Sequence, residues 1–240
     1  MTISGENVQS TVDVARNTIA SAFVTGIGIE VGALHNPLPV PSGAKVRYVD
    51  RMDKADLYDQ YPEMRQYNLV SVDFVDNGET LLTFTNNSQD FVIANHFLEH
   101  CEDPIATLKA FFRVLRTGGV AFLALPDKRF SFDVNRQRTT LTHLIRDHLE
   151  RPVTSRFEHF REWPEFVEPH FGRVYETTEK IERRAHELMN KNYSIHYHVW
   201  EPSDVYEMLG YCADEQGLPL IIEYFLSKDD EMIIVLRKGS

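Results

Sequence analysis

The stretch DFVIANHFLEHCEDPIATLKAFFRVLRTGGVAFLALP (residues 90–126) contains two short apolar runs with a helix-forming segment between them. The runs 90–94 and 120–125 are typical of buried strands. Asp103-Pro104 predicts the start of a helix, because Asp caps a free N–H and Pro suits the first helical position. Apolar residues then recur every three or four positions, and Gly118-Gly119 is expected to end the helix through a positive φ. This order predicts a βαβ unit with parallel strands.

The same alternation of strands and helices continues on both sides of this unit. Upstream, the pattern predicts a helix over 6–24, a short helix over 56–67 that contains Pro62, and strands at 26–32, 45–49 and 69–75. Downstream, Glu201-Pro202 begins a helix, and apolar runs at 220–226 and 232–236 flank a polar turn, as in an antiparallel hairpin. We therefore predict an α/β fold: a Rossmann-like, doubly wound, mostly parallel seven-stranded sheet with an antiparallel C-terminal hairpin.

Residues 127–195 interrupt the alternation. This segment is rich in Arg, His and aromatic residues and has no strand-like apolar run. We expect a mostly helical insertion, or cap, after the fifth strand. The predicted core then consists of residues 1–126 and 196–240.

The composition argues against several classes of protein. With 25 Lys and Arg against 36 Asp and Glu, the formal net charge is −11, which disfavours a nucleic-acid partner. Cys101 and Cys212 are too few for a disulfide framework. No N-terminal basic and apolar leader is present, and no apolar run approaches the roughly 18 residues of a membrane helix. We expect a cytoplasmic protein that does not contact membranes.

The residues that follow the predicted strands are candidates for binding a ligand, because ligands of open parallel sheets bind beyond the carboxyl ends of the strands. These residues are Glu30, Gly32, Ala33, Asp50, Asp76, Asn77, Gly78, Asn95, His96, Asp127 and Lys128. Gly32 lets a ligand approach the backbone, and Asp50 follows it at a spacing that suits hydrogen bonds to ribose hydroxyls. Neither G-x-G-x-x-G after the first strand nor G-x-x-x-x-G-K-[ST] is present. A ligand with a ribose but no phosphate therefore fits best.

Three segments resemble motifs of the class I S-adenosylmethionine (SAM)-dependent methyltransferases, in particular the small bacterial methyltransferase-domain proteins. They are GIEVGA (28–33), YVD (48–50) and, most specifically, FLEH…DP…L…RVLR.GG (97–119). The resemblance covers residues 25–130 well and the closing helix and hairpin loosely. The glycine-rich form of the first motif is reduced here to Gly32.

This resemblance implies an enzyme whose cofactor is SAM. It places Gly32 and Ala33 near the methionine end of SAM, Asp50 on the ribose, and residues 76–78 beside the adenine. Asn95 and His96 would close the pocket, and Glu30 and Arg51 complete the expected cofactor site.

The segment His96-Phe-Leu-Glu99-His100 also spells H-x-x-E-H, an inverted zinc-peptidase motif. On a continuous helix the two histidines would share a face, with Glu99 as a base. This alternative is disfavoured because the motif follows a buried strand and Pro104 comes only four residues later. In the preferred interpretation His96 lines the cofactor pocket.

The insertion is expected to bind the methyl acceptor, since aromatic rings with polar neighbours suit a sugar. The predicted activity is O-methylation of a sugar, glycan or other small polar metabolite, with a histidine as the base. The candidate bases are His143, His196 and His198. The candidate acceptor-binding residues are Asp127, Lys128, Arg129, His159, Trp163 and Trp200.

Several alternatives remain open at this level. They are N- or carboxyl-methylation of a small metabolite and a non-catalytic SAM-binding module. No spacing demands a metal site, although the pair His196 and His198 with nearby carboxylates could bind a divalent ion. The oligomeric state is left open, a homodimer included.

Overall fold

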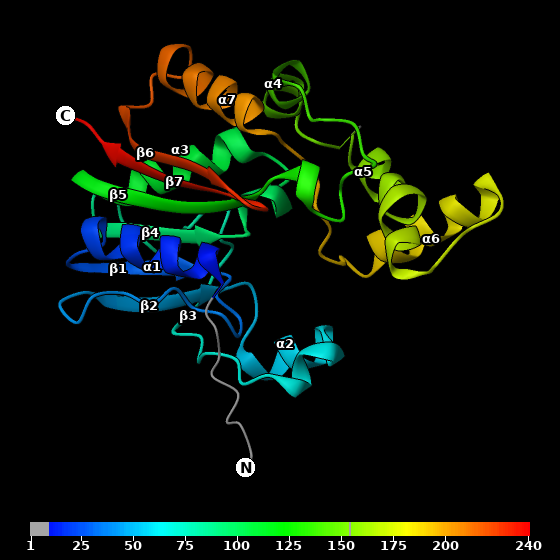
Figure 1. Cartoon of the computed structure of the whole chain (residues 1–240), viewed down its shortest axis with the longest axis horizontal. Coiled ribbons are helices and arrows are strands. Elements are labelled where there is room, and N and C mark those ends of the chain that lie inside the picture. The colour runs from blue at the N-terminus through cyan, green and yellow to red at the C-terminus, as the bar shows by residue number, and fades with distance from the viewer. Residues whose placement is uncertain (1–9, 154) are drawn as a thin grey trace.

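A computed structural model describes residues 10–153 and 155–240, and residues 6–9 of the predicted first helix lie outside them. Within these residues, seven strands form one sheet in the order β3-β2-β1-β4-β5-β7-β6 (Figure 1). They are β1 (Ile27–Val31), β2 (Lys45–Asp50), β3 (Phe74–Val75), β4 (Gln89–Asn95), β5 (Leu115–Pro126), β6 (Leu220–Lys228) and β7 (Glu231–Lys238). The first five run parallel, and β7 is antiparallel to both β5 and β6. The predicted α/β sheet with its C-terminal hairpin is confirmed.

Helices cover both faces of the sheet (Figure 1). On one face, α1 (Thr11–Phe23) packs Ile19 and Ala20 against Phe91 and Ile93 of β4. On the other face, residues of α3 (Pro104–Val114) and α7 (Pro202–Asp214) share one core cluster with the alternate β4 residues Val92 and Ala94. Because successive side chains of a strand point to opposite faces, the unbroken apolar run 91–94 supplies both layers of the core.

Gly118-Gly119 does not end α3, contrary to the prediction. The helix stops at Val114, and β5 begins directly at Leu115, which has an extended backbone. Gly118 does have a positive φ of +82°, but inside β5, opposite a shift in the pairing register of β4. The glycines therefore belong to an irregularity of the strand.

The prediction was also too long for the third strand and for the helix before it. β3 is limited to Phe74–Val75, because it pairs only with the last two residues of β2. The chain before β3 bonds the loop after β1 instead, with the Val70 N–H donating to the Leu34 carbonyl at 2.8 Å. The predicted helix 56–67 is divided into α2 (Lys54–Gln60) and a 3-10 turn at Pro62–Gln66, because proline disfavours a helical conformation at the residue before it.

Residues 127–195 carry the helices α4 (Leu141–Glu150), α5 (Arg156–Glu162) and α6 (Thr178–Asn190). Figure 1 shows α4 beside α7, and α5 and α6 beyond the end of the sheet. Buried Arg136 joins this segment internally: it donates to Asp133 and Glu162 and to the carbonyl oxygens of His196 and Tyr197. Among the described residues, no helix combines the length and apolarity needed to cross a bilayer.

Candidate functional site

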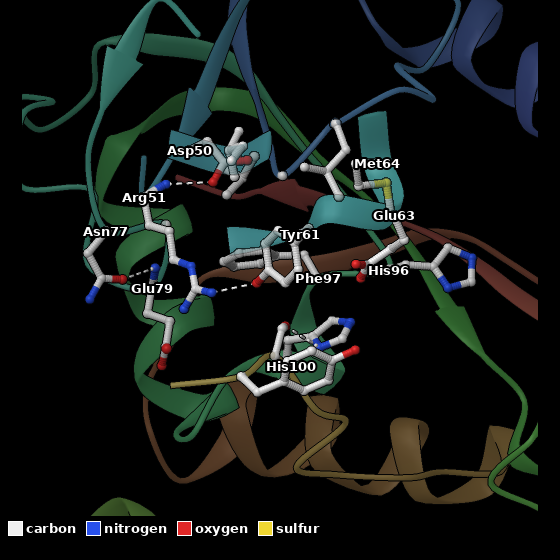
Figure 2. A pocket seen from close by; sticks show the side chains of 17 residues that line it. Asp50, Arg51, Tyr61, Glu63, Met64, Asn77, Glu79, His96, Phe97 and His100 are labelled. Atoms are coloured by element: carbon white, nitrogen blue, oxygen red, sulfur yellow. Dashed lines mark hydrogen bonds between the residues drawn. The ribbon is translucent and has the colours of Figure 1, made fainter. Parts of the chain in front are cut away.

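A cavity of about 360 Å³ lies at the carboxyl ends of β1, β2 and β4 (Figure 2). Its size is near the lower end of the range for small-molecule sites, about 300–1,000 Å³. Six residues of the predicted cofactor site line it: Gly32, Asp50, Arg51, Asn77, Gly78 and His96. Much of the remaining wall comes from residues that sequence reasoning missed: Tyr61, Glu63, Met64, Glu79, Phe97, His100, Tyr193 and Ser194.

Two glycines keep the cavity open. Gly32, just after β1, has a φ of +69°, a conformation that side-chain-bearing residues rarely adopt. At Gly78 the obstacle is space, since a Cβ would lie 2.4 Å from Val31 Cγ1 and 2.6 Å from Phe97 Cζ. Both positions bring backbone, rather than side chain, to the cavity wall.

Asp50 and Arg51 present opposite charges at the end of β2. The Asp50 Oδ1 atom accepts a hydrogen bond from the Arg51 backbone N–H at 2.7 Å (Figure 2), and burial raises the pKa of the Asp50 carboxyl. The Arg51 guanidinium donates to the Tyr61 hydroxyl and lies over that ring, 5.7 Å from its centroid. It also reaches the Asn192 carbonyl oxygen at 3.4 Å, so Arg51 connects the cavity to the insertion.

The loop after β3 adds polar groups. The Asn77 Oδ1 atom accepts from the Glu79 N–H at 2.8 Å, and burial raises the pKa of Glu79 to about 7. Asp76 does not line the cavity: its two carboxylate oxygens accept from the backbone N–H groups of Asn77 and Thr83, each at 2.8 Å. Asp76 therefore shapes the loop that presents Asn77.

Three other residues of the predicted cofactor site do not line the cavity: Glu30, Ala33 and Asn95. The Glu30 side chain is buried, and its Oε1 atom accepts from the Leu38 N–H at 2.9 Å. Burial raises the pKa of Glu30 to about 8. The Asn95 amide is also buried, without a hydrogen-bond partner among the described residues.

Comparison with known proteins decides the family. Residues 23–188 match the family described as a methyltransferase domain. The chain belongs to this methyltransferase-domain family. No curated protein sequence matches it significantly.

Solved structures of the same fold have very different sequences. A SAM-dependent methyltransferase from Aquifex aeolicus has a TM-score of 0.50 and 10% identity, over 94% of this chain and 89% of that chain. A putative methyltransferase from Bacillus halodurans has a TM-score of 0.50 and 12% identity, over 96% and 100%. A structure named as putative zinc-dependent alcohol dehydrogenases from Rhodobacter sphaeroides has a TM-score of 0.57 and 15% identity, over 94% and 90%. At these identities the likeness shows the fold alone. The shared fold and the family match together identify this chain as a methyltransferase that uses SAM as its methyl donor.

In this methyltransferase, the H-x-x-E-H segment does not form the helix that a zinc peptidase requires. His96 has a left-handed φ of +48°, and only Leu98–His100 forms a short 3-10 turn. The His96 Nε2 atom lies 2.6 Å from Glu231 Oε1 and 3.1 Å from an Arg16 guanidinium nitrogen, so it connects the cavity to β7 and α1.

Glu99, His100 and His196 form a group at the insertion side of the cavity, which we call the acid–base cluster. One carboxylate oxygen of Glu99 and one ring nitrogen of each histidine lie within 4.8 Å of one another. Glu99 is fully buried; neither of its oxygens meets the criteria for a hydrogen bond, although His96 Nδ1 lies 3.4 Å from Oε1. The His100 Nδ1 atom lies 2.8 Å from the Ile195 carbonyl oxygen, and burial lowers the pKa of His100 to about 4. His196 was predicted as a candidate base, whereas no local sequence signal assigned Glu99 or His100 to this group.

The other two predicted bases lie elsewhere. His143 and His198 group with His159 in a second cluster, and none of the three lines the cavity. Residues 195–199 form no regular strand, and the rings of His196 and His198 enter different clusters.

The remaining predicted acceptor residues are mostly engaged within the protein. Trp163 packs on Phe132 and His196, and Trp200 is buried and stacked on His198. Asp127 is buried beneath the Arg129 guanidinium, which binds it through two nitrogens. The Lys128 ammonium donates to the Val134 carbonyl oxygen at 3.0 Å.

Proposed function

We propose that this methyltransferase O-methylates a small polar acceptor, such as a sugar or another hydroxylated metabolite. The acceptor enters between the cofactor cavity and the insertion, residues 127–195. The observation that carries the proposal is a buried His–carboxylate pair directly behind a histidine that lines the cavity.

The cavity suits the non-phosphorylated nucleoside of SAM. Asp50 offers a carboxylate at the end of β2, where it would accept hydrogen bonds from the two ribose hydroxyls. Gly32 and Gly78 leave room for the cofactor against the backbone, because a side chain at either position would be strained or would clash. In this proposal Asn77 binds the adenine, and Arg51 with Tyr61 covers the nucleoside. Bound SAM supplies a methyl group on positively charged sulfur.

The buried pair consists of Asp133 and His196. The Asp133 Oδ2 atom lies 2.6 Å from His196 Nδ1, and Oδ1 accepts from Arg136 at 3.1 Å. Burial alone would raise the pKa of Asp133. The hydrogen bond with His196 and the charge of Arg136 outweigh burial and hold this pKa below its ordinary value. Because Asp133 accepts the Nδ1 proton, His196 keeps a lone pair on Nε2 and can take up another proton.

The acid–base cluster connects this pair to the cavity. The ring of His196 lies 4.6 Å, centroid to centroid, from the ring of His100, which lines the cavity. The negative charge of Glu99 opposes the effect of burial, which lowers the pKa of His100. This cluster would take up the proton of the acceptor hydroxyl, which makes the hydroxyl oxygen a nucleophile for the methyl group that bound SAM would supply.

The surroundings favour a ring-shaped polar acceptor of modest size. Tyr61, Tyr193 and Ser194 line the cavity, and Phe132 and Trp163 pack around His196 behind it. Aromatic faces beside hydrogen-bonding groups match the alternating faces and hydroxyls of a sugar ring. A cavity of about 360 Å³ that also holds the cofactor leaves little space for a large acceptor.

The test is a methyl-transfer assay with isotopically labelled SAM. The acceptors are a panel of sugars and polyols, with amines and carboxylic acids as comparison compounds, and product structures are determined by mass spectrometry and NMR. We expect O-methyl products, and His196→Ala should lower the rate about 10²–10⁴-fold, the contribution of a positioned base. SAM affinity, measured by calorimetry, should be unchanged because His196 is outside the cavity lining.

The matched control is His170→Ala, since His170 is exposed and outside both histidine clusters. It should retain full activity. Products methylated only on nitrogen or carboxylate would reject the acceptor class. SAM binding without turnover on any acceptor would instead favour a non-catalytic module, and an unchanged rate in His196→Ala would reject this cluster as the base.

A further inference from the structure

The second histidine cluster lies in the insertion and contains a carboxylate that sequence reasoning did not select. The His143 Nε2 atom lies 3.2 Å from His159 Nε2 and 3.0 Å from Asp147 Oδ2. The His159 Nε2 atom lies 3.7 Å from the same carboxylate oxygen. A ring nitrogen of His198 lies within 4.8 Å of the ligand atoms of both other histidines. We call these four residues the His₃Asp cluster.

Two atoms of this cluster have no partner. Asp147 Oδ2 is buried, and although it lies close to two histidines it accepts no hydrogen bond. His198 Nδ1 is likewise buried without a hydrogen-bond partner. Burying such groups unpaired is costly, and a bound cation would remove that cost for both atoms.

The distances among the His143, His159 and Asp147 atoms match those of a tetrahedral metal centre. Zinc binds imidazole nitrogen and carboxylate oxygen at about 2.0–2.2 Å, so tetrahedral ligand atoms lie about 3.3–3.6 Å apart. The three distances of 3.0, 3.2 and 3.7 Å lie around this value. A cation placed between His143, His159 and Asp147 would contact all three, and the His198 ring would complete the shell by moving toward it.

The secondary structure explains how the four residues meet. His143 and Asp147 are one turn apart on α4, so they share one face of that helix. His159 comes from α5, and His198 comes from the extended segment before α7. The His198 Nε2 atom faces the Glu102 carbonyl oxygen at 3.4 Å, which leaves Nδ1 for the cluster. Such an outer carbonyl commonly orients a metal-binding histidine.

We propose that the His₃Asp cluster binds one zinc ion as a structural centre. Three imidazoles and one carboxylate favour zinc over magnesium or calcium, which prefer oxygen ligands. Four protein ligands complete a tetrahedral shell, and three of the four side chains are almost fully buried. The ion joins α4, α5 and the segment before α7, so it fixes the insertion against the core. This inference does not depend on the acceptor class or on the acid–base cluster.

The experiment uses the full chain purified without a histidine tag. Elemental analysis after zinc addition and dialysis should find about one zinc per chain, the stoichiometry of a single four-ligand site. His159→Ala and His198→Ala should each lose the bound zinc. His170→Ala is the exposed control, and His100→Ala tests the acid–base cluster; both should keep the zinc.

Cobalt substitution provides a second readout that does not require activity. Cobalt bound in place of zinc should show the intense visible absorption of tetrahedral coordination, and Asp147→Asn should weaken it while preserving the size of the side chain. Chelation should lower the thermal unfolding temperature of the unmodified chain and not that of His159→Ala. Absence of bound zinc in the folded chain, or full zinc retention in both His159→Ala and His198→Ala, would overturn the proposal.

Discussion

Gly78→Ala tests whether the cofactor cavity keeps its shape only because this residue in the loop after β3 has no side chain. The added Cβ would lie 2.4 Å from Val31 Cγ1 and 2.6 Å from Phe97 Cζ. Val31 lies in β1, an interior strand of the sheet, and is buried, so close packing restricts its movement. The Phe97 ring lines the cavity and is the group that must shift.

The expected cost follows from this overlap. Overpacking a closely packed site typically destabilises a protein by about 1–3 kcal/mol. In a chain of this size each kcal/mol lowers the unfolding temperature by about 2–4 °C, so a decrease of roughly 2–12 °C is expected. If Phe97 relieves the strain by turning into the cavity, SAM must push it back, and the same free energy weakens binding about 5- to 150-fold.

Thermal unfolding and calorimetric titration with SAM measure both effects. Gly43→Ala is the matched control, because a Cβ at Gly43 would meet no atom within 4 Å. The reasoning is refuted if Gly78→Ala unfolds at the temperature of the unmodified chain and binds SAM equally well.

Three further substitutions test other parts of the structure. Asp50→Ala should weaken SAM binding about 10- to 100-fold through lost charge-assisted hydrogen bonds, whereas exposed Asp59→Ala should leave calorimetric affinity unchanged. The folded-state pKa of Glu30, about 8, lies above its unfolded value, so the unfolding temperature should fall as pH rises from about 4.5 to 8. Glu30→Gln should flatten this decline. An equally steep decline in the variant would contradict the assignment. Arg136→Leu leaves Asp133 buried without its cation and should cost about 3–5 kcal/mol in denaturant unfolding; a loss below about 1 kcal/mol would show that the pair is dispensable.

The strands and helices of the core were largely predictable because their signals are local. The run 91–94 is apolar without interruption because both sheet faces are covered, and Asp103 caps α3 through a 2.9 Å hydrogen bond to the Ala106 N–H. Predictions failed where a partner decides the conformation. β3 is short because only the end of β2 is available to pair with it, and Gly118 lies in a strand because β4 continues beside it.

The expectation that ligands bind beyond the carboxyl ends of parallel strands correctly placed Gly32, Asp50 and Asn77 at one cavity. The same expectation wrongly selected Glu30 and Asp76 as cavity residues. Glu30 accepts the Leu38 N–H, and Asp76 accepts the N–H groups of Asn77 and Thr83. Sequence position alone does not show that these carboxylates are used to hold loops. It could not find Tyr61 or Tyr193, which reach the wall from outside the strand ends.

The amino-acid order by itself determined the layered α/β sheet and the methyltransferase family, because side-chain periodicity, helix caps and strand-end motifs act over a few neighbouring residues. Which histidines come together depends on the tertiary packing. Asp133 and His196 are 63 positions apart, and His198 joins His143 and His159 rather than its near neighbour His196. Contacts between such distant residues depend on how the insertion packs on the sheet, and no local pattern along the chain encodes that packing.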